Sequence, residues 1–329
     1  MSIKAVSPLK VGIVGTGYAA TKRAEALKSD ARTELLVVTG NTPEKMQQFC
    51  QTFAVAAVDS WSRLVNLPEL DLVFVCTINR DCGAIAKAAI LAGKHVVVEY
   101  PLALDLKVAT EIIELAAAQQ KLLHVEHMEI IGGLHQAIKH YLPKIGKVFY
   151  ARYATISSQH PVKCSWKYHR AMFGFPLAAA LSRIHRLTDL FGTVDTVTCQ
   201  NRYWHGADSD YFTACLCNAQ LNFSNDIVAE VTYGKGDIFW QSHRTLEVYG
   251  EKGKILFIGE KGTLITEQNQ IEIPVTPRRG LFAKDTAMVL DYLFDEQPLY
   301  IQPQASLYAL RVASAAQESS SLGKTIYLT

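Results

Sequence analysis

The segment Gly93–Asp105, GKHVVVEYPLALD, places ionisable and aromatic side chains directly after an apolar run. Val96–Val98 has the β-branched composition of a buried strand, and Glu99, Tyr100 and Pro101 follow at once. A carboxylate and a phenol at the end of a strand are suited to contact a ligand or to exchange protons with it. The alternative is an ordinary strand end, in which Tyr100 covers the core and Glu99 bonds to a backbone amide.

The segment Leu122–Ile130, LLHVEHMEI, gathers His124, Glu126, His127 and Glu129 at a predicted strand end. Such a set suggests a metal site, but no H-x-x-x-H or H-E-x-x-H helical spacing is present, and a strand points adjacent side chains to opposite faces. We therefore expect no metal. Glu126 is interpreted as a residue near a ligand, and His127 is a second candidate for binding substrate.

Cationic side chains precede and occupy a predicted helix in the second half of the chain. In SWKYHRAMFGFP, Lys167 and His169 supply positive charge suited to carboxylates or phosphates, unless this is a solvated basic loop. Arg183 and Arg186, in LSRIHRLTDLFG, lie one helical turn apart. A guanidinium binds carboxylates bidentately, and its pKa above ~12 makes it a poor direct proton donor.

Either arginine can be the one that contacts a ligand, and Arg183 is the leading candidate. The structural alternative makes Arg183 a helix-surface residue that pairs with Asp189 or Glu99.

A glycine loop, Gly15-x-Gly17-x-x-Ala20, stands between the strand-like Lys10–Val14 and the helix-like Ala19–Lys28. A dinucleotide site needs a tight turn, close backbone approach to the pyrophosphate and a small third residue, in that order. The context is correct on both sides. We expect cofactor contacts from this loop and from the end of a later strand, namely from Gly15, Thr16, Gly17, Tyr18, Ala19, Thr77, Ile78 and Asn79.

The next strand, Glu34–Thr39, is followed by Asn41 and Thr42 where an NAD-binding protein has an acid. Asn and Thr donors with a nearby cation suit the 2′-phosphate of NADP, which an acid would repel. The sequence therefore favours NADP over NAD, with NADH as a weaker alternative.

Three residues are candidates for the cation at the 2′-phosphate: Lys45, or Lys22 and Arg23 of the first helix. The alternative role for Asn41 is to cap the helix that begins at Pro43.

Alternation of apolar strands and helices predicts an α/β fold: a doubly wound parallel sheet over residues 1–125. After about Gly146 a succession of strands predicts an α+β domain with a large open antiparallel sheet over residues 126–329. Two helices, about Phe282–Phe294 and Gln304–Ser320, close the chain and could pack back on the first domain.

Composition excludes several classes of protein. The 329 residues are 49% hydrophobic and 19% charged with a net charge of +2, which is typical of a globular protein and not of a nucleic-acid binder. No run approaches the ~20 apolar residues that span a bilayer, and no signal peptide is expected. Seven cysteines without C-x-x-C pairs fit a reducing compartment, so we expect a cytoplasmic protein.

A strand ending VCTIN, a helix, AGKHVVVE and then a proline resemble the glucose-fructose oxidoreductase/inositol dehydrogenase (GFO/IDH/MocA) superfamily. The resemblance implies a Rossmann domain joined to an open antiparallel sheet. Sugar dehydrogenases of the superfamily usually have Glu-Lys-Pro, with a lysine that assists proton transfer at an alcohol, where this chain has Tyr100. Their Asp-x-x-x-His pair falls at or near Ala178 and Ser182. The resemblance thus implies a substrate other than a sugar or inositol.

Glu-Tyr-Pro and the ordered blocks ELAA, LLHVEHMEI, FGFP and LSRIHRLTDLFG resemble the biliverdin reductase branch of the superfamily. This resemblance implies an oxidoreductase acting on a CH-CH type bond. NADPH would give hydride to the C10 methine of biliverdin, a linear tetrapyrrole, and a pyrrole nitrogen would gain a proton, giving bilirubin. It also implies a segment over the nicotinamide that contains Trp166 and Lys167.

The expected roles follow from both lines of reasoning. Catalytic candidates are Arg183, Tyr100 and Glu99; cofactor contacts also come from Glu99, Tyr100, Asn41, Thr42, Trp166 and Lys167; substrate contacts come from Arg183, Arg186, Glu126, His127, Lys167 and His169. Rival functions are reduction of a small carbonyl or imine with NADP and non-catalytic dinucleotide sensing. An open sheet also offers a surface for a homodimer.

Overall fold

The computed structural model describes residues 8–205 and 210–328. They fall into two units, one from the described part of Met1–Met128 with Arg279–Leu307, the other from Glu129–Arg278 with Tyr308–Thr329. The chain thus leaves the first unit, builds most of the second and returns to the first. The predicted boundary between residues 125 and 126 stays a proposal.

The first unit is a six-stranded sheet in the order β3-β2-β1-β4-β5-β6, and every pair of neighbours is parallel. This is the doubly wound order in which the strand sequence reverses between β1 and β4, and ligands bind beyond the carboxyl ends of such strands. The strands are β1 (Leu9–Val14), β2 (Thr33–Thr39), β3 (Ala56–Ala57), β4 (Leu72–Val75), β5 (His95–Glu99) and β6 (Leu123–Glu126).

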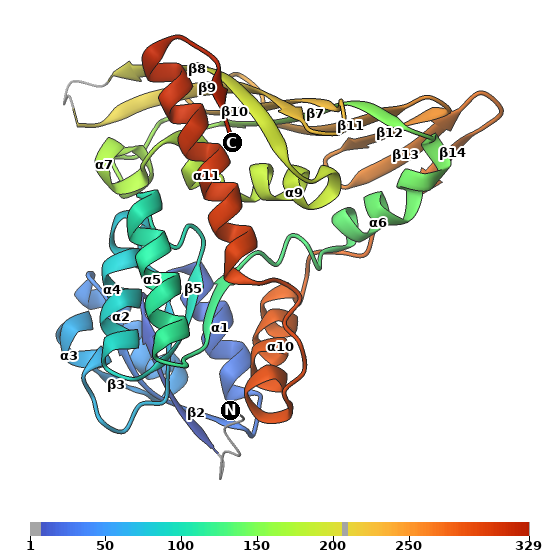
Figure 1. The fold of residues 1–329 in the computed structure, drawn as a ribbon. Helices are drawn as coiled ribbons and strands as arrows, with labels where there is room; N and C mark the ends of the chain where they lie inside the picture. Colours follow the sequence, from blue (N-terminus) through green and yellow to red (C-terminus); the bar gives the residue numbers. More distant parts are fainter. Residues whose placement is uncertain (1–7, 206–209, 329) are drawn as a thin grey trace. The chain divides into compact units, whose positions relative to one another are not determined.

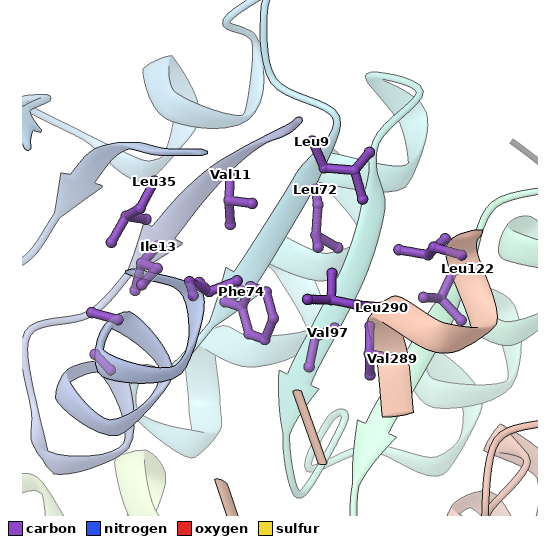
Figure 2. Packing of buried hydrophobic residues seen from close by; sticks show 14 of the residues in the cluster. Leu9, Val11, Ile13, Leu35, Leu72, Phe74, Val97, Leu122, Val289 and Leu290 are labelled. Carbon is purple, nitrogen blue, oxygen red and sulfur yellow. The ribbon is translucent and has the colours of Figure 1, made fainter. Parts of the chain in front are cut away.

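Helices cover the first sheet, and one of them comes from far along the chain. They are α1 (Tyr18–Lys28), α2 (Pro43–Phe53), α3 (Trp61–Val65), α4 (Asn79–Leu91), α5 (Leu106–Ala118) and α10 (Leu281–Asp295). In Figure 1, α10 lies beside α1. Figure 2 shows Val289 and Leu290 of α10 among the core side chains of β1, β4 and β5. The first core is therefore complete only when the chain returns.

The second unit is a nine-stranded mixed sheet in the order β14-β13-β12-β11-β7-β10-β9-β8-β15. Only β7 and β10 pair in parallel among the described strands, and the other pairs are antiparallel. The strands are β7 (Val148–Ser158), β8 (Val194–His205), β9 (Phe212–Phe223), β10 (Val228–Gly236), β11 (His243–Gly250), β12 (Gly253–Ile258), β13 (Lys261–Thr266), β14 (Gln270–Ile273) and β15 (Ile326–Tyr327).

Short helices and one long helix, α11, accompany this sheet. They are α6 (Gly133–Tyr141), α7 (Arg170–Phe173), α8 (Pro176–Ala179), α9 (Ser182–Phe191), α11 (Pro303–Leu322) and the 3-10 turns η1 (Leu142–Ile145) and η2 (Trp166–Tyr168). The Tyr308 and Ser319 hydroxyls fix α11 to β8, because they accept hydrogen bonds from the backbone N–H groups of Val194 (2.7 Å) and Cys199 (2.9 Å).

The predicted fold class is confirmed, with one departure in detail. The second sheet is mostly antiparallel as expected, but β7 and β10 are parallel, which alternation of side chains along a strand does not reveal. Among the described residues no helix is long and apolar enough to cross a membrane. The homodimer through the open sheet stays a prediction.

Candidate functional site

The glycine loop has the geometry that a dinucleotide site requires. Gly15 has φ +122°, and a Cβ on it would lie 2.0 Å from the carbonyl oxygen of Cys76, so only glycine fits. Gly17 precedes α1, and a Cβ there would meet nothing within 4 Å in the protein. The α1 N-terminus has no side-chain cap and no acidic residue in its first turn. Its backbone N–H groups can therefore receive an anion.

The end of β2 is polar and exposed. Asn41, Thr42 and Lys45 are all exposed. The N-cap of α2 is Thr42, without a side-chain capping bond, so the alternative capping role for Asn41 is wrong. Asn41 and Thr42 keep their predicted role at the 2′-phosphate as a proposal. Beyond β4, Thr77 and Ile78 are half-buried.

One of the three cation candidates is corrected by the structure. Arg23 is fully buried and its guanidinium is held by acids of the protein itself, so it does not offer its charge to a phosphate. Sequence reasoning did not reveal this burial of Arg23, because its partners Glu99 and Asp285 are 76 and 262 residues away in the chain. Lys22, which pairs with Glu25 at 2.7 Å, and Lys45 stay candidates.

Arg23 is the centre of a buried polar cluster at the carboxyl ends of β5 and β6. Its Nε donates to Glu99 (2.9 Å), and its Nη1 donates to Asp285 and to the Thr286 hydroxyl (2.9 Å). Burial by itself lowers the pKa of Arg23, but the charges of Asp285 and Glu99 outweigh burial and raise it well above its ordinary value. Arg23 thus fixes the position of the glutamate that opens the Glu-Tyr-Pro motif.

Glu126 lies in the same cluster, opposite Glu99 in the pairing of β5 with β6. It is buried and accepts a hydrogen bond from the Met128 backbone N–H. Burial, and next the charges of Glu99 and Asp285, raise the pKa of Glu126 well above its ordinary value. Its carboxyl group therefore binds a proton more tightly than an exposed glutamate does.

Tyr100 stacks on a buried histidine. The rings of Tyr100 and His127 are 5.2 Å apart and 8° from parallel, and His127 Nε2 is 2.8 Å from the Ser306 hydroxyl. His127 has no exposed surface. His127 therefore supports the ring of Tyr100, and its predicted contact with substrate stays a proposal.

The second unit contains a cluster of arginines around one carboxylate. Glu129 accepts hydrogen bonds from Arg186, Arg244 (3.1 Å) and Arg278 (2.7 Å). Burial raises the pKa of Glu129, but these arginines together with Arg183 outweigh it and lower the pKa to about 2. Sequence reasoning missed Arg244, which stands in no motif, and interpreted the basic segment TPRRG, which contains Arg278, as a surface turn.

Arg183 and Arg186 share one face of α9, as their spacing predicts. Arg183 lies 5.9 Å from the ring centre of Tyr233 and donates to the Ser182 hydroxyl at 2.8 Å, whereas Arg186 lies 5.7 Å from the ring of Tyr153. Arg186 is 1% exposed and Arg183 is half-buried. Of the two, Arg183 is therefore the better placed to meet a ligand.

The acids suggested as structural partners of Arg183 are occupied by other groups. Asp189 is bonded to His135 at 2.8 Å and to Lys139 at 3.3 Å, and Glu99 is bonded to Arg23.

A buried lysine holds the Trp166–Tyr168 turn. Lys235 donates to the backbone carbonyl of Lys167, and its ammonium lies 3.2 Å from the ring centre of Phe173. Burial lowers the pKa of Lys235 to about 7. The Lys167 side chain is exposed, and His169 accepts a hydrogen bond from the Met172 N–H as the cap of α7. The ligand contacts predicted for Trp166, Lys167 and His169 stay proposals.

Family models match both parts of the chain. Residues 9–127 match the NAD-binding Rossmann fold of the GFO/IDH/MocA oxidoreductase family, and residues 142–328 match its C-terminal alpha/beta domain. The chain belongs to the GFO/IDH/MocA oxidoreductase family.

Individual proteins are similar to this chain over different lengths. Biliverdin reductase from Synechocystis sp. PCC 6803, solved in complex with biliverdin and NADP+, is 52% identical with a TM-score of 0.94, covering 96% of this chain and 100% of that one. Mouse biliverdin reductase A is 26% identical over 61% of this chain, and the match spans 65% of the mouse protein. GenD2 of gentamicin A biosynthesis, solved with NAD, is 19% identical with a TM-score of 0.82, a likeness of fold alone.

The first prediction concerns Arg23. Replacing it by methionine removes the charge but keeps much of the volume, and it leaves the buried Asp285 and Glu126 and the half-buried Glu99 without this cation. We expect Arg23→Met to lower the free energy of unfolding by about 3–5 kcal/mol, the range for a broken buried ion pair. Urea unfolding measures this change.

Arg32→Met is the matched control. Arg32 pairs with Asp30 and Asp291 but is 29% exposed, so its loss should cost less than about 1 kcal/mol. Equal effects of the two substitutions would contradict a central role for Arg23.

Proposed function

We propose that this chain reduces biliverdin to bilirubin with NADPH, as an oxidoreductase acting on a CH-CH type bond. The observation that carries the proposal is the 52% identity, over both domains, to the Synechocystis protein whose structure holds biliverdin and NADP+. NADPH, when bound, supplies a hydride to the C10 methine carbon. A pyrrole nitrogen gains a proton in the same overall reaction. A cytoplasmic location stays a prediction.

The chain lacks the residues with which sugar dehydrogenases oxidise an alcohol, and this supports reduction of biliverdin. Oxidation of a sugar alcohol needs a base, and the lysine of the sugar-dehydrogenase motif is replaced by Tyr100. Ala178 and Ser182, which stand at or near the expected Asp and His, are both buried. Reduction of a methine bridge deprotonates no alcohol, so these losses are compatible with the proposed chemistry.

The residues of the first unit have the proposed task of holding NADPH. The glycine loop and the uncapped α1 N-terminus suit the pyrophosphate, and Asn41 with Thr42 suits the 2′-phosphate. Glu99, fixed by Arg23, and Tyr100, stacked on His127, present a carboxylate and a flat ring at the end of β5. We assign the nicotinamide to this end of the sheet, with Glu99 and Tyr100 as its contacts.

The residues of the second unit have the proposed task of binding the tetrapyrrole. Its two propionates are anions, and four arginines surround the single carboxylate of Glu129. Arg183 can bind a propionate or donate to the polar pyrrole edge through its planar fork.

The experiment that tests the function is an absorbance assay. Mixing the protein with biliverdin and NADPH should convert the green verdin spectrum to the yellow rubin spectrum, with consumption of NADPH. Myo-inositol or glucose with NADP+ should give no reduction above background, because the alcohol base is absent. Steady oxidation of either polyol, with no change in biliverdin, would move the chain to the sugar branch of the family.

A substitution of Arg183 tests its role in turnover. We expect Arg183→Ala to lower turnover by about 10²-fold or more, as for a lost charge-stabilising donor, with little change in NADPH affinity. Arg183→Lys should recover little, since a point charge cannot reproduce the planar fork. Steady-state rates and NADPH titrations measure both effects.

Two further variants serve as controls for Arg183→Ala. Arg202→Ala, at an exposed arginine of β8, should leave turnover unchanged. Arg186→Ala should lower thermal stability, because Arg186 is buried against Glu129. Normal turnover in folded Arg183→Ala would show that this arginine is not the one that acts.

A substitution of Asn41 tests the cofactor preference. Asn41→Asp places a negative charge where the 2′-phosphate is proposed to bind, so NADPH should bind at least about tenfold more weakly while NADH affinity changes little. The matched control is Gln51→Glu, which introduces the same charge at an exposed position of α2. If the parent binds NADH as tightly as NADPH in titrations, the interpretation of the β2 end is wrong.

A further inference from the structure

Tyr153 of β7 is a buried phenol held by a guanidinium. It is 1% exposed, and its hydroxyl oxygen accepts hydrogen bonds from Arg244 Nη2 (2.7 Å) and Nε (3.1 Å). The Arg244 guanidinium also lies 5.6 Å from the ring centre of Tyr153. A buried tyrosine needs one partner for its hydroxyl, and this one accepts two charged donors.

Charged groups of several elements act on Tyr153. Arg186 of α9 lies 5.7 Å from its ring centre, and Arg244 of β11 is bonded to its hydroxyl. The charge of Arg183 on α9 also acts on it, and Glu129, which precedes α6, is the acid among these charged groups. Its register partners on β10 and β11, Val231 and Leu246, are apolar. Cations therefore outnumber carboxylates around the phenol.

This imbalance stabilises a phenolate. Burial raises the pKa of Tyr153, but the charges of Arg186, Arg183 and Arg244 outweigh burial and lower it below the ordinary value for tyrosine. Glu129 is ionised, so one cation is already neutralised and the others remain to compensate a second negative charge. A phenol whose anion is stabilised in this way is a competent proton donor.

Arg183 cannot by itself supply a proton, whereas the phenol of Tyr153 can. A guanidinium stays protonated in proteins, so Arg183 can pass a proton on only if another group replaces it at the same time. Arg183 is half-buried, whereas Tyr153 has almost no exposed surface. Arg183 is thus suited to contact the ligand, and Tyr153 is suited to supply the proton.

We propose that Tyr153 stores the proton that the reduction of biliverdin consumes, and that Arg183 passes it on. This inference rests on the proposed function. As hydride reaches C10, Arg183 gives one N–H proton to a pyrrole nitrogen and takes the Tyr153 hydroxyl proton, so that its own charge is unchanged. The phenolate left on Tyr153 is held by Arg244 and Arg186 until solvent returns a proton.

Tyr153→Phe tests the proposal through the dependence of turnover on pH. The parent rate should be nearly constant near neutral pH and fall at alkaline pH as Tyr153 loses its proton. The variant should be slower by about 10²-fold at pH 8, the lower end for loss of a general acid, and should recover as pH falls because solvent acid replaces the phenol. A purely structural role would lower the rate by the same factor at every pH.

Controls separate this effect from other titrations. Tyr150→Phe changes a tyrosine of the same strand, on the opposite face, and should leave the profile unchanged. Lys235, whose pKa is about 7, titrates in parent and variant alike, so only the difference between the two profiles is assigned to Tyr153.

Arg244→Gln provides a second test without removing the phenol. Fewer cations then hold the phenolate, so the alkaline fall in rate should move to higher pH. Ultraviolet titration of tyrosinate in the ligand-free protein should show the same shift, and the acidic tyrosine should be missing in Tyr153→Phe.

The outcomes distinguish the two proposals. If the parent reduces biliverdin and Tyr153→Phe, shown to be folded by thermal unfolding, is equally fast or uniformly slowed across pH, the role of Tyr153 is refuted and the proposed function stands. If the parent does not reduce biliverdin at all, the proposed function fails, and the role of Tyr153 fails with it.

Discussion

The buried guanidinium of Arg23 is the constraint on which the first unit depends. It connects α1 to Glu99 at the end of β5 and to Asp285 on α10, segments that are 76 and 262 residues away in the chain. A buried charge is tolerated only when its partners are in place, so removing any one of them is costly. The Glu-Tyr-Pro motif and the returning helix are thus fixed by one side chain, and the core of the first unit is completed by a helix that follows β14 in the chain.

Buried charges shift the pKa of a glutamate in opposite directions in the two units: the pKa of Glu126 is raised and that of Glu129 is lowered. In the first, burial and the charges of Glu99 and Asp285 raise the pKa of Glu126, although Arg23 lowers it. In the second, four arginines act on Glu129, so the carboxylate is ionised and the phenol of Tyr153 is acidified. Surplus positive charge suits a dianionic substrate such as a tetrapyrrole with two propionates, and this complementarity supports the proposed function.

Local patterns predicted much of this structure, and partners distant in sequence explain the rest. The apolar runs and the glycine loop correctly indicated the parallel sheet, and α2 begins at Pro43 as expected, because these features depend on neighbouring residues. Arg23 was misassigned to the cofactor phosphate, since nothing on its helix reveals Asp285. Glu129 and Tyr153 were not recognised as a site, because a carboxylate and a phenol acquire their properties from arginines on other elements.

The two reactive side chains of Glu-Tyr-Pro are both held in place by other residues of the first unit. Glu99 is fixed by an ion pair with Arg23, and Tyr100 lies flat on His127, which is bonded in turn to Ser306. An ordinary strand end would need none of these supports. A lysine in place of Tyr100 would present a mobile charge suited to an alcohol, whereas a stacked phenol presents a rigid, largely apolar face. A planar conjugated substrate gains from that face without any base, so the replacement of lysine by tyrosine changes the kind of surface at the end of β5 as well as removing a proton acceptor.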